Sequence, residues 1–445
     1  MSKVLMSWGG LRVPAMMLGL SLAAGCGGGS SSGGGTGGGG GNSTTVTFTV
    51  KDATPTTVAA KIGSGAYAAQ SLSSGTLTLS LPSGTTDFAV AYACPPQTFA
   101  PVGVLSGTAT RQTVFEASTA DGTSFPLSCA QTPAGTQSGT LTGSVDASAL
   151  PTYSFLQIEA ANGDSLSGTV PGQNGSFSFA APAGTDRVEL LAYLNSPVGT
   201  LPPSSGLVAV RTFDNQPVPG ALNGGNPVVL TAADQTTPQT VTYKNVPAGF
   251  AAPTLQVMFN MAGKSAFVVG YGNGNAYPAL PAAAVEAGDS YFFIAADYQT
   301  SIEGLGLGQA VVAAATTPTG GPMTFSFPAP WSYSGPTPAA LPTFDFTYVG
   351  FAGNTGLERL AILTWLTGGN ENVFTVIATG NYGKGSTQTS FPDLSALTGF
   401  LAAPASGTTV RWSAEIGQFS YAAGQTAPSS STGSSVVNAG SYTVP

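Results

Sequence analysis

Short runs in which apolar and polar residues alternate recur along the whole chain, and clusters of Gly, Pro, Ser and Thr separate them. Examples are Val46–Val50, Leu141–Val145 and Met323–Phe327. Successive side chains of a β-strand point to opposite faces of its sheet, so a period of two residues buries one face and leaves the other in water. The clusters in between contain the residue types that reverse the chain. The sequence therefore predicts an all-β fold.

A turn followed by a strand occurs four times at long intervals. Its glycine is Gly84, Gly184, Gly288 or Gly407, and these glycines lie 100, 104 and 119 residues apart. In three of the copies a proline closely precedes the glycine; proline fixes φ before the turn, and glycine tolerates the positive φ that reverses the chain. The spacing is that of successive domains and is too long for a solenoid repeat. We therefore predict four tandem antiparallel β-sandwich units, at residues 44–132, 139–232, 239–333 and 342–445.

Stretches rich in Pro, Thr, Gly and Ser separate the predicted units near residues 131–139, 231–239 and 334–342. Because proline stiffens a short linker, we expect an elongated string of separate sandwiches and not one globule. One local alternative stays open in the fourth unit, since the run Leu357–Leu366 fits a helix as well as a strand.

The second unit has the clearest family pattern. A turn at residues 162–164 is followed by the run from Gly175 to Gly184 and then by an alternating strand that ends in Ala192-Tyr193. This order resembles the carboxypeptidase-regulatory, or transthyretin-like, β-sandwich. It is equally similar to Ig-like repeats of the fibronectin type III kind. The resemblance implies a two-layer antiparallel sandwich and does not choose between these families.

The N-terminus has the parts of an export signal: Lys3 and Arg12, then the apolar stretch Val13–Leu22, then small residues up to Cys26. Directly after Cys26 comes a tract of Gly and Ser. This arrangement resembles the lipobox of bacterial lipoproteins. The resemblance implies that residues 1–25 are removed as a signal peptide and that Cys26 carries lipid, palmitate included. A plain secretory signal is the alternative.

Residues 26–43 then follow as the lipidated cysteine and a Gly/Ser-rich tether. A flexible coil of this composition has an r.m.s. span of roughly 20–25 Å, so we expect the first sandwich to stand away from the lipid surface. Gly27 does not match the Asp that retains such lipoproteins in the inner membrane of enteric-type bacteria. The resemblance therefore favours the outer membrane or the cell surface.

With Cys26 assigned to lipid, Cys94 and Cys129 remain. Both follow strand-like runs of the first unit, and an even number of cysteines in an exported chain points to a disulfide. A redox or metal-binding thiol pair is the alternative, but the sequence offers it no third ligand.

The chain contains no histidine, which excludes Ser-His-Asp and Cys-His catalysis and His-ligated zinc. Pairs of carboxylates could still hydrolyse glycosides. The candidate pairs are Asp186 with Glu189, Glu286 with Asp289, and Glu371 with Asp393. Most acidic residues stand in turns, where capping explains them. We therefore expect no catalytic residue, no metal site and no cofactor, and a carboxylate-dependent hydrolase remains a second alternative.

Charged residues make up 7% of the chain, against about 25% in ordinary soluble domains. After removal of residues 1–25, ten basic residues stand against twenty acidic ones, and the basic residues are scattered singly. Binding to phosphates needs clustered Lys or Arg, so nucleic acid is excluded as a partner.

Aromatic residues are the remaining candidates for ligand binding. Trp331 and Tyr333 lie in an irregular segment between two predicted units, where exposed rings could stack on a sugar or contact a protein partner. Trp365 and Trp412 lie in alternating runs and are predicted to be core residues.

Together these features favour a lipid-anchored cell-envelope protein with a non-enzymatic structural or interaction role. Its partners would be the membrane, reached through the N-terminal lipid, and other envelope proteins or polysaccharide. The first alternative is a carbohydrate-binding or adhesin-like surface lipoprotein that uses Trp331 and Tyr333.

Overall fold

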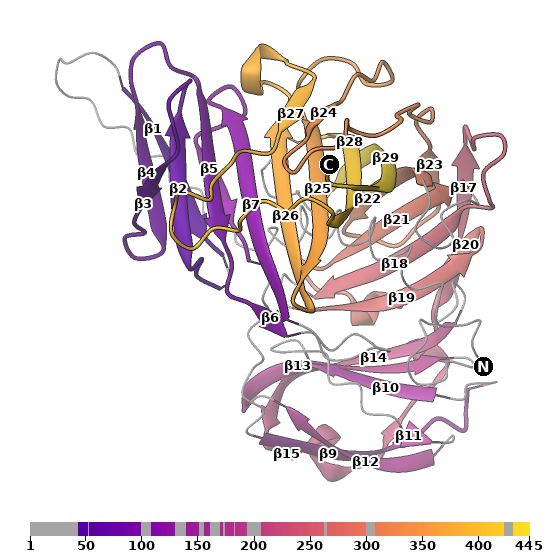
Figure 1. Ribbon diagram of the computed structural model, residues 1–445. Helices are drawn as coiled ribbons and strands as arrows, with labels where there is room; N and C mark the ends of the chain where they lie inside the picture. The colour runs from indigo at the N-terminus through magenta and orange to yellow at the C-terminus, as the bar shows by residue number, and fades with distance from the viewer. Residues whose placement is uncertain are drawn as a thin grey trace.

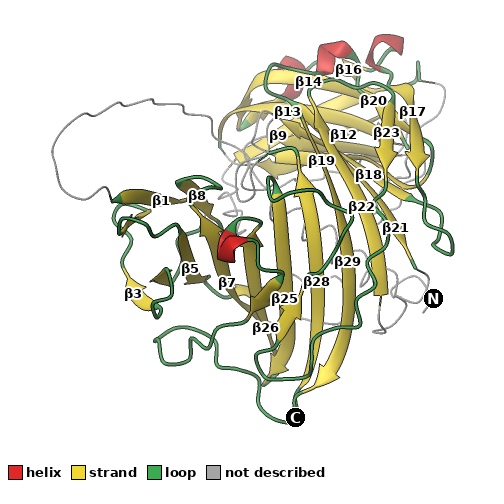
Figure 2. Ribbon diagram, turned by 90° about the horizontal axis from the view of Figure 1, so that it is seen from above, coloured by secondary structure: helices red, strands yellow, loops and turns green. Residues whose placement is uncertain are grey.

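The computed structural model describes residues 43–445 except 52, 99–107, 130–138, 151–154, 161–169, 172–173, 182, 194–205, 262–264, 300–307 and 422–429. Cys26, the predicted signal peptide and the turn at residues 162–164 lie outside the described residues. Of the described residues, 58% are in strands and 4% in helices, and none of their helices reaches seven residues. The predicted all-β class is confirmed (Figures 1 and 2).

The strands fall into four groups in chain order, called units 1 to 4. Unit 1 comprises β1 (Thr44–Val50), β2 (Thr57–Ile62), β3 (Ala68–Gln70), β4 (Thr76–Leu81), β5 (Asp87–Ala93), β6 (Gln97–Thr98), β7 (Thr108–Ser118) and β8 (Ser124–Leu127). Unit 2 comprises β9 (Gly139–Asp146), β10 (Phe155–Ala160), β11 (Val170–Pro171), β12 (Asn174–Ala181), β13 (Gly184–Tyr193), β14 (Leu207–Val218), β15 (Gly220–Ala221), η1 (Leu222–Gly225), β16 (Val228–Val229) and η2 (Ala232–Asp234).

The other two units contain the remaining elements. Unit 3 comprises β17 (Thr237–Lys244), β18 (Thr254–Met261), β19 (Ser265–Asn273), β20 (Ala276–Ala279), η3 (Ala282–Ala284), β21 (Ser290–Tyr298), β22 (Gly308–Thr317) and β23 (Met323–Ser326). Unit 4 comprises β24 (Thr343–Asp345), β25 (Leu357–Thr367), β26 (Asn370–Thr379), η5 (Tyr382–Lys384), β27 (Gln388–Ser390), β28 (Thr409–Phe419) and β29 (Ser431–Thr443). The run Leu357–Leu366 is therefore strand, and the helical alternative is wrong.

All four units share one strand order. Each has a four-stranded antiparallel layer, in the orders β3-β2-β5-β7, β11-β10-β13-β14, β19-β18-β21-β22 and β26-β25-β28-β29. In a second, smaller layer the first strand of the unit pairs antiparallel with β4, β12, β20 or β27. In units 1 to 3 that first strand also pairs parallel with a late strand of the unit. The repeat seen in the sequence is thus a repeat of topology.

The recurring glycine occupies the same place in every unit. Gly84, Gly184, Gly288 and Gly407 each lie where the chain passes from the smaller layer to the third strand of the four-stranded layer. All four have positive φ, at 81°, 139°, 95° and 83°. A side chain at such a φ is strained, which explains why glycine stands at this turn each time.

The units are not separate beads. The four-stranded layers of units 1, 3 and 4 join edge to edge into one 13-stranded sheet (Figures 1 and 2). β22 of unit 3 pairs antiparallel with β29 of unit 4, and β26 of unit 4 pairs parallel with β7 of unit 1. The expected string of sandwiches joined only by linkers is corrected on this point, because edge strands left with unpaired N–H and C=O groups gain partners by pairing with one another.

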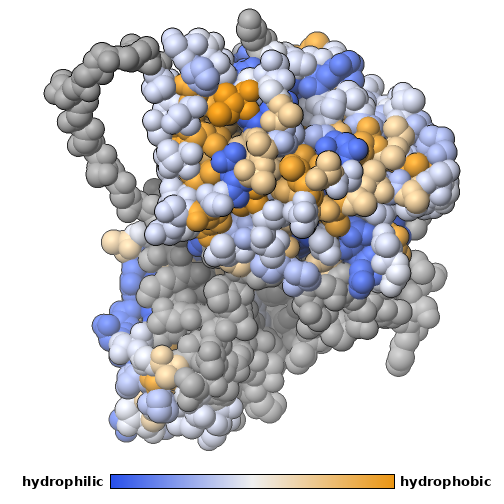
Figure 3. All heavy atoms as spheres, turned by 60° about the vertical axis from the view of Figure 1, so that its left-hand side comes forward, coloured by the Kyte–Doolittle hydropathy of each residue, from blue (hydrophilic) through white to orange (hydrophobic). Residues whose placement is uncertain are grey.

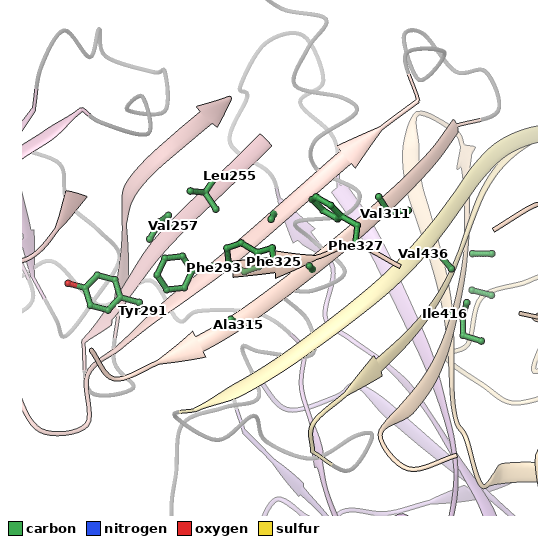
Figure 4. Close-up of a cluster of buried hydrophobic side chains, with 14 of the residues drawn as sticks. Leu255, Val257, Tyr291, Phe293, Val311, Ala315, Phe325, Phe327, Ile416 and Val436 are labelled. Atoms are coloured by element: carbon green, nitrogen blue, oxygen red, sulfur yellow. The ribbon is translucent and has the colours of Figure 1, made fainter. Parts of the chain in front are cut away.

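The largest hydrophobic cluster lies on one face of this sheet and draws residues from all four units. Figure 4 shows part of it, where the side chains of Val311, Val436 and Ile416 follow one another across β22, β29 and β28. Trp365 and Trp412 are buried in the same cluster, as predicted from their alternating runs. Units 1 and 2 each have a smaller cluster of their own as well.

Unit 2 keeps two sheets of its own and packs against unit 3 through one face of β13. Leu191 and Tyr193 on that face belong to the large cluster, whereas Leu190 and Ala192 on the other face belong to the core of unit 2. The Tyr193 hydroxyl donates to the carbonyl of Val268 in β19 at 2.9 Å.

The predicted disulfide is confirmed. Cys94 and Cys129 are bonded and buried, Cys94 directly after β5 and Cys129 shortly after β8. The bond therefore joins the two layers of unit 1 at one end of the sandwich, and 35 residues separate the two cysteines in sequence.

Replacement of both cysteines by alanine should lower the free energy of unfolding by about 3 kcal/mol, because the cross-link restricts the unfolded chain. Urea unfolding followed by circular dichroism measures the change. A reductant should shift the midpoint of the wild-type protein and leave that of the double variant in place. Equal midpoints for the wild type and the variant under oxidising conditions would contradict the prediction.

Candidate functional site

The rings predicted to bind a ligand are part of the core. Trp331 is 3% exposed, and its ring stacks on those of Tyr333 and Phe346 at centroid distances of 4.6 and 5.6 Å. Its indole N–H donates to the carbonyl of Thr347 at 3.0 Å. Tyr333 is half-buried and meets Trp412 edge to face at 5.7 Å. The expected exposed platform is thus corrected, because the irregular segment folds back onto the sheet and buries the Trp331 ring.

In the part of the chain that the structure describes, no three Cys, Asp or Glu side chains come together in a way that could hold a metal ion. No helix in the same residues has the length and apolar character needed to span a membrane. The fold brings ionisable side chains from two units together between units 1 and 4 and between units 2 and 3, while Arg211 pairs with Asp234 inside unit 2.

The junction of β7 with β26, called the seam, carries a row of ionisable residues on one face of the sheet. The strand registers place Lys61 of β2 opposite Ala89, Ala89 opposite Glu116 of β7, Glu116 opposite Ala378 of β26, and Ala378 opposite Arg359 of β25. Residues opposite one another in register share a face. Glu116 therefore lies between two cations, with an alanine on each side.

Glu116 is buried, with 7% of its surface exposed. Burial raises the pKa of Glu116 to about 7, because the ionised carboxylate loses its water. Attraction to Lys61, a hydrogen bond with Tyr382 and the charge of Arg359 oppose this shift without cancelling it. The carboxyl group thus gains or loses its proton close to neutral pH.

Two tyrosines pack around the row. The Lys61 ammonium lies 5.6 Å from the ring centroid of Tyr67 and 6.0 Å from that of Tyr382, within the range of a cation–π contact. Burial, and then the negative charge of Glu116, raise the pKa of both phenols, so both stay neutral. Arg359 donates to the carbonyl of Thr379 at 2.8 Å, while its buried Nε has no partner.

Carboxylates of unit 1 accept hydrogen bonds from unit 4 across the seam. Asp121 accepts from the Thr379 hydroxyl at 2.5 Å and from the Asn381 amide at 2.7 Å. Asp87 accepts from the backbone N–H of Gly383 at 3.1 Å. These bonds fix the end of β26 and the turn after it against unit 1.

A second buried group joins units 2 and 3. The Arg187 guanidinium lies 2.7 Å from Glu189, 2.9 Å from Asp289 and 3.5 Å from Glu286, and it donates to the carbonyl of Ala284 at 3.1 Å. Burial raises the pKa of Glu189 to about 7 in spite of the arginine. Of the six acidic residues singled out in the sequence, Glu189, Glu286 and Asp289 therefore meet at one arginine, which ties unit 2 to unit 3.

A third buried glutamate lies inside unit 4, one strand away from its junction with unit 3. Glu415 of β28 lies opposite Val437 of β29, and Val437 lies opposite Ala310 of β22 in unit 3. Burial raises the pKa of Glu415 to about 7, Ser435 opposes the shift, and the charge of Glu358 adds to it. Glu116 and Glu189 thus titrate near neutrality where two units meet, and Glu415 does so within unit 4.

The sequence does carry a signal for these residues. Glu116 follows Thr113-Val114-Phe115, and Glu358-Arg359 precede Leu360-Ala361-Ile362-Leu363. Charged residues next to such apolar strand runs indicate buried ionisable groups, and groups of this kind seldom lie in the interior without a partner.

No protein-family model matches the chain, and no curated protein matches it. The resemblances to bacterial lipoproteins and to sandwich families therefore rest on the sequence motifs alone.

Replacement of Arg187 by glutamine should destabilise the protein by about 3–5 kcal/mol, because it leaves buried carboxylates without their cation. Chemical denaturation measures the loss. Arg411, which is exposed, supplies the matched control, and Arg411→Gln should change stability by less than about 0.5 kcal/mol. Similar losses for the two variants would contradict a tie made by Arg187.

The protein should be more stable near pH 5 than near pH 8. Glu116, Glu189 and Glu415 have folded pKa values of about 7, above the ordinary value of 4.5. Between pH 4.5 and pH 7 the folded protein binds more protons than the unfolded chain. The contribution of these groups to the free energy of unfolding is therefore fully present below pH 4.5 and is lost as the pH rises through 7. Each group contributes up to roughly 3 kcal/mol. Urea unfolding across this range at constant ionic strength tests the profile, and a rise of stability with pH would refute it.

Proposed function

We propose that this chain is a lipid-anchored cell-envelope protein with a non-enzymatic structural or interaction role. The observation that carries the proposal is the 13-stranded sheet, which holds units 1, 3 and 4 as one body. The buried ion pair of Arg187 with Asp289 docks unit 2 onto that body. A body joined in this way presents a fixed surface to partners, as a structural or interaction element requires.

The N-terminal sequence supports the anchor. The order of charge, apolar stretch, small residues and Cys26 resembles the lipobox, and the following Gly/Ser tract would serve as the tether. Lipid on Cys26 would hold the protein at the outer membrane or cell surface, where its partners would be envelope proteins or polysaccharide.

The surface supports an exposed location as well. Among its coloured residues, the face in Figure 3 is largely pale, with separate strongly hydrophilic patches and a group of hydrophobic residues across its upper part, in keeping with a chain of which only 7% is charged. Carbohydrate binding is less well supported, because Trp331 is buried in the core.

The anchor is tested by Cys26→Ser in cells labelled with radioactive palmitate. The wild-type protein should take up label and sediment with membranes, whereas the variant should lose both properties. The double variant Cys94→Ala/Cys129→Ala is the control and should keep its label, because lipid attachment does not involve these cysteines. An unmodified, freely released wild-type chain would refute the proposal.

The interaction role is tested by crosslinking intact envelopes and identifying the attached proteins. A reproducible partner that is lost when surface residues of one unit are changed would support the role. Crosslinked products that follow protein abundance alone would speak against it.

A further inference from the structure

The seam has a weaker backbone connection than the rest of the large sheet. Among the described strands of that sheet, β26 and β7 form the only parallel pair, and parallel pairing is slightly less stable per residue. The side of unit 1 that faces the main body adds little apolar area, since its fully buried contributions to the large cluster are Ala59, Ala91 and Val114. Other contacts that must break include those of Tyr67, which packs against the same cluster, and two hydrogen bonds to unit 4, in which the Thr57 hydroxyl donates to the carbonyl of Thr398 and the Leu401 N–H donates to the Gln112 side chain.

Unit 1 can also remain folded when the seam opens. It has its own core, which includes Phe48, Phe88, Phe125 and the disulfide of Cys94. The chain passes from unit 1 to unit 2 only after β8, so the two units stay connected by residues 128–138. Separation at the seam therefore breaks hydrogen bonds between units and leaves the sandwich itself intact.

Ionised Glu116 is poorly compensated in the closed seam. The groups that face it are Lys61 from β2, Tyr67 from the turn after β2, Arg359 from β25 and Tyr382 from η5. The carboxylates nearest to this set are Asp121, which interacts with Arg359, and Asp87, which interacts with Tyr382. The Tyr67 hydroxyl and the Arg359 Nε make no hydrogen bond. Of the facing groups, only Tyr382 hydrogen-bonds to Glu116, whereas carboxylates that stay charged inside proteins accept two or three such bonds.

We propose that Glu116 acts as a proton-operated latch: neutral Glu116 holds unit 1 against unit 4, and ionisation of Glu116 loosens the pairing of β7 with β26. In the open seam the carboxyl group meets water and returns toward its ordinary acidity. The closed form therefore binds the proton more tightly than the open form, so a rise in pH favours opening. This inference goes beyond the proposed function and does not depend on the lipid anchor.

Hydrogen exchange of the full-length protein tests the latch, with rates corrected for the chemical effect of pH. When the pH is raised from about 5.5 to about 8, the equilibrium constant for opening of the seam should increase about tenfold. The amides in β7 and β26 should lose protection from exchange by the same factor. The amides of β1 and β4 inside unit 1 should keep their protection. Equal protection of β7 and β26 at both pH values would overturn the proposal, as would equal loss in β1 and β4.

Glu116→Gln replaces the carboxyl group with a neutral one of the same shape, so the seam of this variant should stay closed at both pH values. Glu189→Gln and Glu415→Gln are matched controls, since both residues are buried with pKa values raised to about 7 but lie outside the seam. In both control variants, the junction of β7 with β26 should open as the pH rises, as it does in the wild-type protein. A pH-dependent seam in Glu116→Gln would overturn the assignment. If that variant does not fold, the wild-type comparison of β7 and β26 with β1 and β4 still decides.

Discussion

Edge strands carry backbone groups that must find partners, and the pairing of these edges holds the molecule together. Nine residues of β22 pair with β29, and eight residues of β26 pair with β7. The two outer ends of the joined sheet are protected in other ways. At one end the Tyr193 hydroxyl binds the carbonyl of Val268 in β19, and at the other β3 has only three residues, with the Gln70 amide bound to the carbonyl of Ala68. Edges are thus either paired or blunted, as proteins require to avoid aggregation.

Buried charge gives the junction of units 2 and 3 a defined geometry. Apolar surfaces alone can slide past one another, whereas the Arg187 guanidinium meets Asp289 with two bonds of 2.9 Å in one arrangement only. We interpret these groups as determinants of how the units dock, since burial of charge adds little to stability. The same burial raises the pKa of Glu116, Glu189 and Glu415 toward neutrality. Specific docking and sensitivity to pH therefore have one physical cause.

Local features were predictable from the sequence, and long-range ones were not. Alternation identified β1, β9 and β23, the turn glycines have the expected positive φ, and the even pair of cysteines forms its disulfide, because each depends on nearby residues or on simple counting. The joined sheet depends on which free edges meet, and any edge with an alternating pattern offers the same backbone groups. The position of Glu116 opposite Ala378 follows from that choice. Trp331 was misjudged because its segment has no periodicity, although it packs as tightly as a strand.

The seam joins the first unit of the chain to the last. Asp121 and its hydrogen-bond partner Thr379 are 258 residues apart. The ribosome must therefore synthesise most of the polypeptide before β7 can pair with β26. Until then the β7 edge is open during synthesis, a stage at which incomplete chains are prone to associate. A product that stops before β26 would keep this edge exposed for good. The last unit thus covers the free edges of both β7 and β22, and a fragment that lacks this unit would expose both.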